Sequence, residues 1–245
     1  MQRIHTVVTN SQGRRDQMTA VHTLERDLYV VSDAARILGL RPQTLRNWLQ
    51  GYSRNGREYE PVIRASRNTI ETVTWGEFIE AGFLTEYRQH RKVPLGQIRT
   101  YVTERREVLG VRYPLAHEQP YVSANAELYD DIATDGQQPV YRRASDGQLI
   151  FTPWTEDFLD KVEFDANVAS AYLPEGKTGF IKVDPVRSFG APTAGGIRTE
   201  ALFELAAAGQ LIDEIASDFG LGHDIVEAGI NYQATLLGIE GPAAA

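Results

Sequence analysis

The chain has 245 residues, of which 42% are apolar and 24% are charged, and its formal net charge is −8, which suits one large or two ordinary domains of a soluble protein. The absence of cysteine excludes a disulfide framework, a thiol nucleophile and cysteine-ligated metal, and it is compatible with a reducing cytoplasm. No apolar run reaches the roughly 18 residues of a membrane span and the N-terminus carries no secretory signal, so we expect a cytoplasmic protein without a membrane partner.

The first elements have the pattern of a helix-turn-helix. Residues 1–26 are polar and lack a hydrophobic period, so we predict a flexible tail with no role in the core. Residues 29–51 contain two short helical patterns on either side of Gly39, which suits a left-handed helix end. Ser32 is predicted to cap the first helix, and Pro42 suits the first turn of the second. The buried face of the second helix is predicted from its apolar spacing: Leu45, Trp48 and Leu49.

The next elements indicate a wing and two longer helices. The dipeptide Asn55-Gly56 lies between polar and aromatic residues and is a strong signal for a two-residue hairpin, which we interpret as a wing. Thr74 and Glu77 form a capping-box pattern that opens a helix. Pro94 begins another helix, which Gly110 closes.

Beyond residue 114 the pattern changes to short apolar alternations, with a second hairpin predicted around Asp146-Gly147. Residues 159–180 look irregular and acidic, and three short helices follow. The predicted core of these helices is Leu202, Leu205, Ile212, Ile215, Ala216, Phe219, Ile225, Val226 and Ile230. The predicted fold class is therefore mainly α with small β elements (α+β). Four units are predicted: a tail (1–26), a winged helix-turn-helix domain (27–114), an acidic middle region with a β-hairpin (115–182) and a trihelical domain (183–240).

The charge is divided unevenly along the chain. Residues 1–114 hold 18 Lys and Arg against 12 Asp and Glu, a net charge of +6, whereas residues 115–245 hold 7 against 21, a net charge of −14. A basic half suits a polyanion, and an acidic half would repel one. The average of −8 therefore hides an N-terminal half that is suited to nucleic acid.

The predicted DNA contacts come from the second helix, the turn before it and the wing. A helix of this kind fits the major groove, where its outward polar side chains reach base edges or phosphates. Arginines on the turn and the wing would mainly position the protein on phosphate. Trp48 is expected in the core. The predicted DNA-binding residues are Arg41, Gln43, Thr44, Arg46, Asn47, Arg54, Arg57, Arg64 and Arg67.

The segment SDAARILGLRPQTLRNWLQGY resembles the winged module of MerR-like regulators. The order of helix-turn-helix, wing, acidic middle and final helices resembles VapB-type antitoxins with a C-terminal domain of unknown function 433. That resemblance implies a PIN-type ribonuclease toxin as partner. Its C-terminal signature is matched by Phe189, Gly190, Pro192, Gly196 and Arg198 and by the run LAAAGQLIDEIASDFGL. Ile197 and Glu200 stand where that family commonly has threonine and proline.

No catalytic pattern is present in the sequence. The five histidines are isolated, and neither an HExxH nor a GxSxG motif occurs. The glycine-rich segment FGAPTAGGIR lacks the lysine-serine ending of a P-loop, and we interpret it as a structural turn. We therefore expect a protein that is not an enzyme and that has no metal, no cofactor and no catalytic residue.

Three functions are compatible with these patterns. The first is an antitoxin that represses its own operon as a homodimer on double-stranded operator DNA and neutralises a PIN-type toxin by protein contact. The second is a stand-alone MerR-like dimeric transcriptional regulator without a toxin. The third is an adaptor whose helix-turn-helix binds protein instead of DNA.

Overall fold

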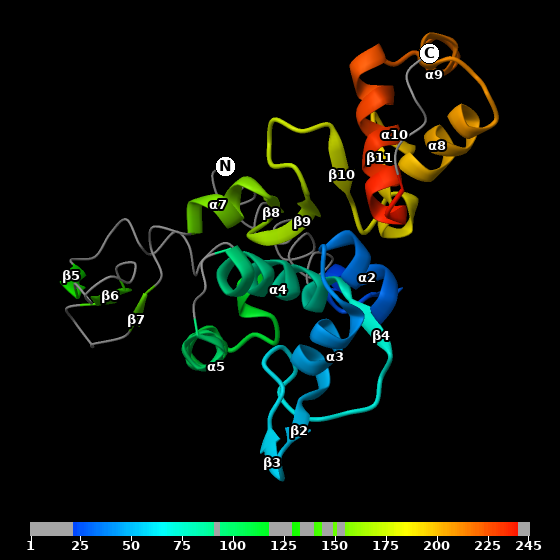
Figure 1. Ribbon diagram of the computed structural model, residues 1–245. Coiled ribbons are helices and arrows are strands. Elements are labelled where there is room, and N and C mark those ends of the chain that lie inside the picture. The colour runs from blue at the N-terminus through cyan, green and yellow to red at the C-terminus, as the bar shows by residue number, and fades with distance from the viewer. Residues whose placement is uncertain are drawn as a thin grey trace, which may run out of the picture.

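The computed structural model describes residues 22–90, 94–117, 129–132, 140–143, 149–150 and 155–239. Helices and small antiparallel sheets alternate along these segments, which confirms the α+β fold class (Figure 1). The turn at Asp146-Gly147 lies outside the described residues, but the strands on either side of it pair as predicted. These strands form a small antiparallel sheet with a third: β5 (Tyr129–Ile132), β6 (Val140–Arg143) and β7 (Leu149–Ile150).

The helix-turn-helix is formed by α2 (Val31–Ile37) and α3 (Pro42–Gln50). Gly39 has φ +65° between them, as a left-handed helix end requires. The predicted cap at Ser32 is wrong, because β1 (Asp27–Val30) runs directly into α2 and Val30 occupies the cap position without a side-chain hydrogen bond. The amide of Val31 is satisfied instead by the carbonyl of Glu71, at 3.2 Å.

A buried helix supports the helix-turn-helix from behind. After β4 (Thr72–Thr74), which pairs with β1, every residue of α4 (Trp75–Thr85) is buried. The predicted capping box of Thr74 and Glu77 is present at its start. A short π-helical turn, η1 (Glu86–His90), continues α4, and α5 (Leu95–Leu109) begins after Pro94 and ends at Gly110 in the left-handed conformation.

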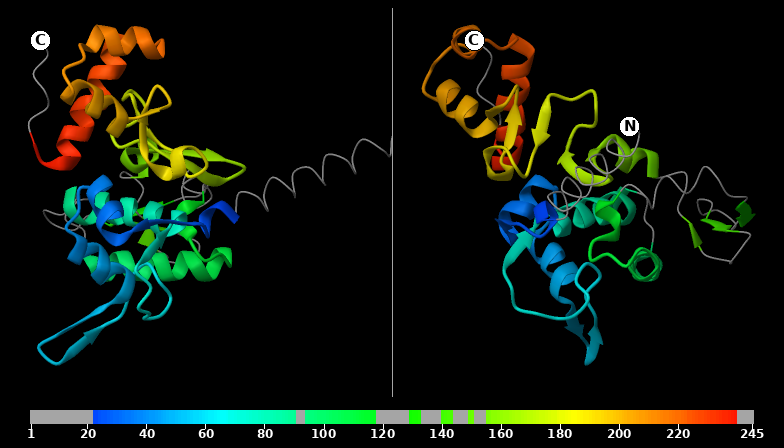
Figure 2. Two further views of the ribbon diagram at one scale, coloured as in Figure 1. Left: turned by 90° about the vertical axis from the view of Figure 1, so that its right-hand side faces the viewer. Right: turned by 180° about the vertical axis from the view of Figure 1, so that it is seen from behind.

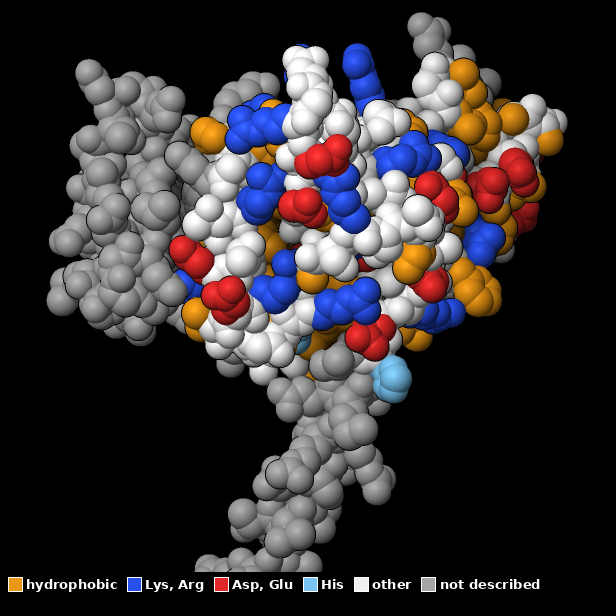
Figure 3. All heavy atoms as spheres, turned by 90° about the horizontal axis from the view of Figure 1, so that it is seen from below, with side chains coloured by type: hydrophobic (Ala, Val, Ile, Leu, Met, Phe, Trp, Pro, Cys, Tyr) orange, Lys and Arg blue, Asp and Glu red, His pale blue; other side chains and the backbone are white. Residues whose placement is uncertain are grey.

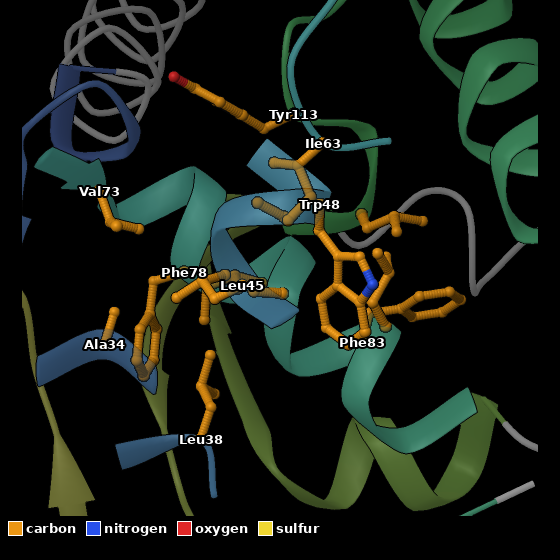
Figure 4. Close-up of a cluster of buried hydrophobic side chains, with 14 of the residues drawn as sticks. Ala34, Leu38, Leu45, Trp48, Ile63, Val73, Phe78, Phe83 and Tyr113 are labelled. Carbon is orange, nitrogen blue, oxygen red and sulfur yellow. The ribbon is translucent and has the colours of Figure 1, made fainter. Parts of the chain in front are cut away.

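One apolar core joins the helix-turn-helix to elements far along the chain. Side chains from the end of α2, from α3 and from α4 converge in it, and they include the C-cap residue Leu38, Trp48 and Phe83 (Figure 4). The core also includes Phe158 of α7 (Thr155–Asp160), which packs edge-on against Phe83 with the ring centroids 5.3 Å apart. Leu24 is 2% exposed in the same core. The expectation that residues 1–26 have no core role is therefore wrong for the end of that segment.

The stretch that looked irregular in the sequence forms the first two strands of a five-stranded sheet. Five antiparallel strands lie in the order β12-β11-β10-β9-β8. The turn between β8 and β9 is Ala166-Asn167, and both of its residues have positive φ, +48° and +65°. Trp75 ties this sheet to α4, because its indole N–H donates to the carbonyl of Ala169 at 2.7 Å. The strands are β8 (Val162–Asp165), β9 (Val168–Tyr172), β10 (Ile181–Val183), β11 (Pro192–Ala194) and β12 (Ile197–Arg198).

The three C-terminal helices are present as predicted and form a second, smaller core with β10 and β11. Most of the predicted core residues are buried or half-buried there, but Phe219 is 40% exposed and does not belong to it. In the molecule these helices lie at the end opposite to the hairpin of β2 (Tyr52–Arg54) and β3 (Arg57–Tyr59) (Figure 1, Figure 2). They are α8 (Thr199–Ala207), α9 (Ile212–Phe219) and α10 (His223–Leu237).

The loop after β10 connects this unit to the helix-turn-helix. The hydroxyl of Tyr29 in β1 donates to the carbonyl of Gly190 at 2.9 Å, and burial raises the pKa of Tyr29 well above its ordinary value. Arg26 donates to the carbonyl of Pro185 at 3.1 Å and lies over the ring of Phe189. The two cores are thus joined through a few specific polar contacts next to α2.

Candidate nucleic-acid interface

Helix α3 presents a polar surface opposite its buried face. It contains no acidic residue, and Leu45, Trp48 and Leu49 are buried against the core as predicted. Gln43 is exposed, and its amide donates to the side-chain oxygen of Asn47 at 2.8 Å. This hydrogen bond orients two amide side chains, a type that pairs with adenine in the major groove.

Arg46 and Gln50 extend this surface by one turn and share one carboxylate. The guanidinium of Arg46 lies 3.2 Å from one oxygen of Glu71, and the amide of Gln50 donates to the other at 3.3 Å. These hydrogen bonds, chiefly that from Arg46, hold the pKa of Glu71 below its ordinary value. Because both groups are exposed, we treat the pair as an orienting contact of small energy.

The wing is the hairpin of β2 (Tyr52–Arg54) and β3 (Arg57–Tyr59), which projects from the body of the molecule (Figure 2). Asn55 and Gly56 both have positive φ, +53° and +72°, as a type I′ turn requires, so the predicted hairpin is confirmed. Tyr52 and Tyr59 stack at its base with ring centroids 4.6 Å apart. At its tip Arg54 and Arg57 are directly opposite each other and exposed.

Arg67 supports the wing from the following loop. It donates to the carbonyls of Tyr52 at 3.4 Å and Tyr59 at 2.9 Å, and it forms ion pairs with Glu58 and Glu60. Its charge is therefore largely matched by neighbouring carboxylates. The structure places Arg67 in the loop after the wing, where it holds both strands of the hairpin.

Arg64 lies in the interior and not on the exposed surface of α3 and the wing. Its side chain is 4% exposed, and its guanidinium forms a two-pronged ion pair with Glu77 at 2.7 and 3.0 Å. Its other donors bind Asn68 and the carbonyls of Ile70 and Thr72. Because it is buried and fully engaged, Arg64 cannot reach phosphate, and its inclusion among the DNA contacts is wrong.

Helix α5 contributes cations that sequence reasoning did not assign to this site. Arg99 donates to the carbonyl of Glu60 at 3.1 Å, and Arg106 donates to the carbonyl of Ile63 at 2.7 Å. Both contacts hold the segment that leads from the wing back to the core. Lys and Arg side chains lie over this side of the molecule, interspersed with acidic ones (Figure 3).

The histidines and carboxylates of the described segments form no metal site beside this surface. No group of three or more His, Asp or Glu with metal-binding geometry occurs among the described residues. His223 is exposed and lies 2.6 Å from Asp213, a hydrogen bond that raises its pKa, whereas burial lowers the pKa of His117. Within the same segments, no helix combines the length and the apolar character of a membrane span.

Comparison with known proteins agrees with this geometry. Residues 27–102 match the family described as "Putative DNA-binding HTH domain", a range that covers the helix-turn-helix, the wing, α4 and half of α5. The crystal structure of Rv2018 from Mycobacterium tuberculosis has a similar fold, with a TM-score of 0.60 and 21% sequence identity, over 84% of this chain and 99% of that one.

The uncharacterized protein Rv2308 of Mycobacterium tuberculosis is 30% identical over 234 residues, which span 89% of this chain and 94% of that protein. The similarity therefore extends far beyond the helix-turn-helix, into the sheet and the C-terminal helices. The chain belongs to the same family as Rv2308, and its own N-terminal part is a helix-turn-helix domain of the DNA-binding type.

Proposed function

We propose that the protein is a transcriptional regulator that binds double-stranded DNA with α3 in the major groove and the wing beside it. The observation that carries this proposal is the wing tip. Arg54 and Arg57 face each other across the hairpin, and neither forms an ion pair with any residue that the structure describes. Like charges directly opposite each other destabilise a hairpin, and a phosphate between or beside them would remove that repulsion.

Helix α3 supports the same proposal with groups that read bases. Gln43, Asn47 and Arg46 lie on successive turns of one surface, and α3 brings no carboxylate of its own to it. Amide side chains pair with adenine and arginine pairs with guanine, and each good pair discriminates by about 1–3 kcal/mol. Arg41 lies at the start of the helix and is exposed, in a position suited to the phosphate backbone.

The test is a titration of fluorescent duplex DNA from upstream of the protein's own gene, compared with a scrambled duplex, at several salt concentrations. We expect Arg46→Ala to lose about 1–3 kcal/mol of affinity and to relax selectivity at one base position. Arg187→Ala is the matched control, because it removes the same charge from an exposed residue of the loop after β10. Equal affinity for both duplexes, or equal effects of the two variants, would contradict the proposal.

The finer parts of the proposal come from the sequence resemblance and the charge division. We infer that the protein binds palindromic sites as a homodimer, since operator symmetry mirrors protein symmetry. The exposed acidic residues of α8 and α9, such as Glu204, Asp213 and Asp218, favour a basic protein partner over DNA at that end. A PIN-type toxin that this end neutralises is the partner which the resemblance implies.

Co-expression with the product of the neighbouring gene separates the remaining alternatives. Co-purification of a toxin-sized ribonuclease, with loss of its activity in the complex, would support the antitoxin role. Promoter binding without such a partner would leave the stand-alone regulator. An absence of salt-sensitive binding to the promoter, together with capture of a protein by α3, would favour the adaptor.

A further inference from the structure

A cavity of about 270 Å³ lies where the helix-turn-helix meets the C-terminal helices. One wall comes from β1 and α2 and the other from the loop after β10, α8 and α10. No motif of the sequence indicated it, because its two walls are more than 150 residues apart along the chain. A ligand in this cavity would touch both walls at once.

The inner end of the cavity holds unused hydrogen-bond donors. Gln233 is 9% exposed, and its carbonyl oxygen accepts the hydroxyl of the buried Thr199 at 2.8 Å. Its amide N–H groups bind none of the residues that the structure describes. Thr199 is also the first residue of α8, whose start has no side-chain cap. The N–H groups of that first turn and the amide of Gln233 therefore offer donors at the same end of the cavity.

Two arginines line the cavity, Arg36 and Arg198, together with two carboxylates, Asp33 and Glu200. Arg198 lies at the start of α8 and donates to the carbonyl of Ser188 at 3.2 Å. The second arginine of the cavity, Arg36, is already paired with Asp33 at 2.8 Å. Glu200 also lines the cavity, and its carboxylate opposes a second negative charge. A monoanion is thus favoured over a doubly charged phosphate.

The rest of the lining is apolar and selects the body of the ligand. Leu28, Ile37 and Leu236 line the wall, and Pro192 and Phe189 lie on the loop side. Phe189 is 70% exposed and has φ +55°, so a large ring is held at this site in a conformation that favours glycine. The volume of about 270 Å³ lies just below the roughly 300–1,000 Å³ of typical ligand pockets, which suits a small ligand of about ten non-hydrogen atoms.

We propose that this cavity binds a small apolar monocarboxylate, with its carboxylate at the start of α8 beside Arg198 and Gln233 and its apolar body against α2. Because both walls contribute, the bound ligand would fix the C-terminal helices relative to α2 and so change DNA affinity by linkage. This last step rests on the proposed DNA-binding function, whereas ligand binding itself does not.

The first experiment measures binding to the full chain by calorimetry, with benzoate and phenylacetate as probes and benzyl alcohol as the neutral analogue. At about 10 mM, well above the millimolar dissociation constants reached by ligands of this size, we expect a carboxylate to saturate the site and the alcohol not to. Arg198→Gln should weaken carboxylate binding about tenfold, while Arg187→Gln should not change it. Absence of carboxylate binding, equal binding of the alcohol, or no effect of Arg198→Gln would overturn the proposal.

The second experiment repeats the DNA titration with and without the saturating carboxylate. A change in DNA affinity that Arg198→Gln removes and Arg187→Gln retains would support coupling, and unchanged affinity would overturn it. Failure of the ligand-free protein to bind DNA would instead refute the proposed function, while the calorimetric result on the cavity would stand. The two failures are therefore distinguishable.

Discussion

The buried ion pair of Arg64 and Glu77 gives the sharpest prediction about the N-terminal part of the chain. The guanidinium fixes Asn68 and two backbone carbonyls of the segment between the wing and β4. Glu77 in turn accepts the amide of Thr74 at 3.1 Å at the start of α4. Replacing Arg64 with methionine removes the charge and all these donors, but leaves most of the side-chain volume.

The expected cost is large because Glu77 would remain buried at 2% exposure without a cation. Breaking a buried pair by removing one partner typically costs about 3–5 kcal/mol, and the loss of hydrogen bonds to Ile70 and Thr72 adds to it. A typical domain is stable by only about 5–15 kcal/mol. Arg64→Met should therefore remove a substantial part of the stability of the fold.

Urea unfolding followed by tryptophan fluorescence measures this loss, since Trp48 and Trp75 lie in the same core. Arg67→Met is the matched control, and we expect it to cost less than about 1 kcal/mol because its ion pairs are exposed. Adding Glu77→Gln to Arg64→Met should recover part of the loss, since glutamine retains the capping box without the charge. A cost below about 1 kcal/mol for Arg64→Met, or no recovery in the double variant, would refute the reasoning.

Three further predictions concern other parts of the molecule. Replacing both Arg54 and Arg57 by glutamine should flatten the dependence of log affinity on log salt by about one per arginine, as measured in the DNA titration; an unchanged slope would place the wing off the phosphates. Gly190→Ala should lower the free energy of unfolding by about 1–3 kcal/mol, because φ is +75° and a Cβ would overlap the Tyr29 hydroxyl. Gly196→Ala is the control: its φ is +85°, but the space around it is open, so it should lower the free energy of unfolding by less. Burial raises the pKa of Glu80 to about 8. Between the unfolded pKa near 4.5 and that value, only the folded state holds the proton, so the free energy of unfolding should fall with rising pH by at most about 1.4 kcal/mol per pH unit. Glu80→Gln should reduce this slope, as measured by urea unfolding at several pH values.

Local backbone rules explain which parts of the fold were predictable. The dipeptide Asn55-Gly56, the left-handed Gly39 and the capping box of Thr74 are determined by a few adjacent residues, and the structure has each of them. The β8–β9 hairpin was missed because its turn is Ala166-Asn167, which lacks the glycine of the common signal.

The candidate site was predictable only where a residue's role follows from its own helix. Spacing alone placed Gln43 and Asn47 on the outer surface of α3, opposite Trp48. Arg64 was misassigned because its burial depends on Glu77, thirteen positions away, and a charge in a sequence does not reveal its partner. The cavity beside α2 was invisible for the same reason, since its polar end is formed by Gln233 from the last helix.

The shared core has a consequence for any attempt to isolate the helix-turn-helix. Phe78 of α4 packs edge-on against Tyr172 of β9 at a centroid distance of 5.4 Å, and the indole of Trp75 depends on the backbone of the same strand. A fragment that stops after residue 117 would retain α3 and the wing but expose this side of α4 to water. Truncation alleles that lose DNA binding would then be degraded as misfolded chains, even though every proposed DNA contact is still encoded.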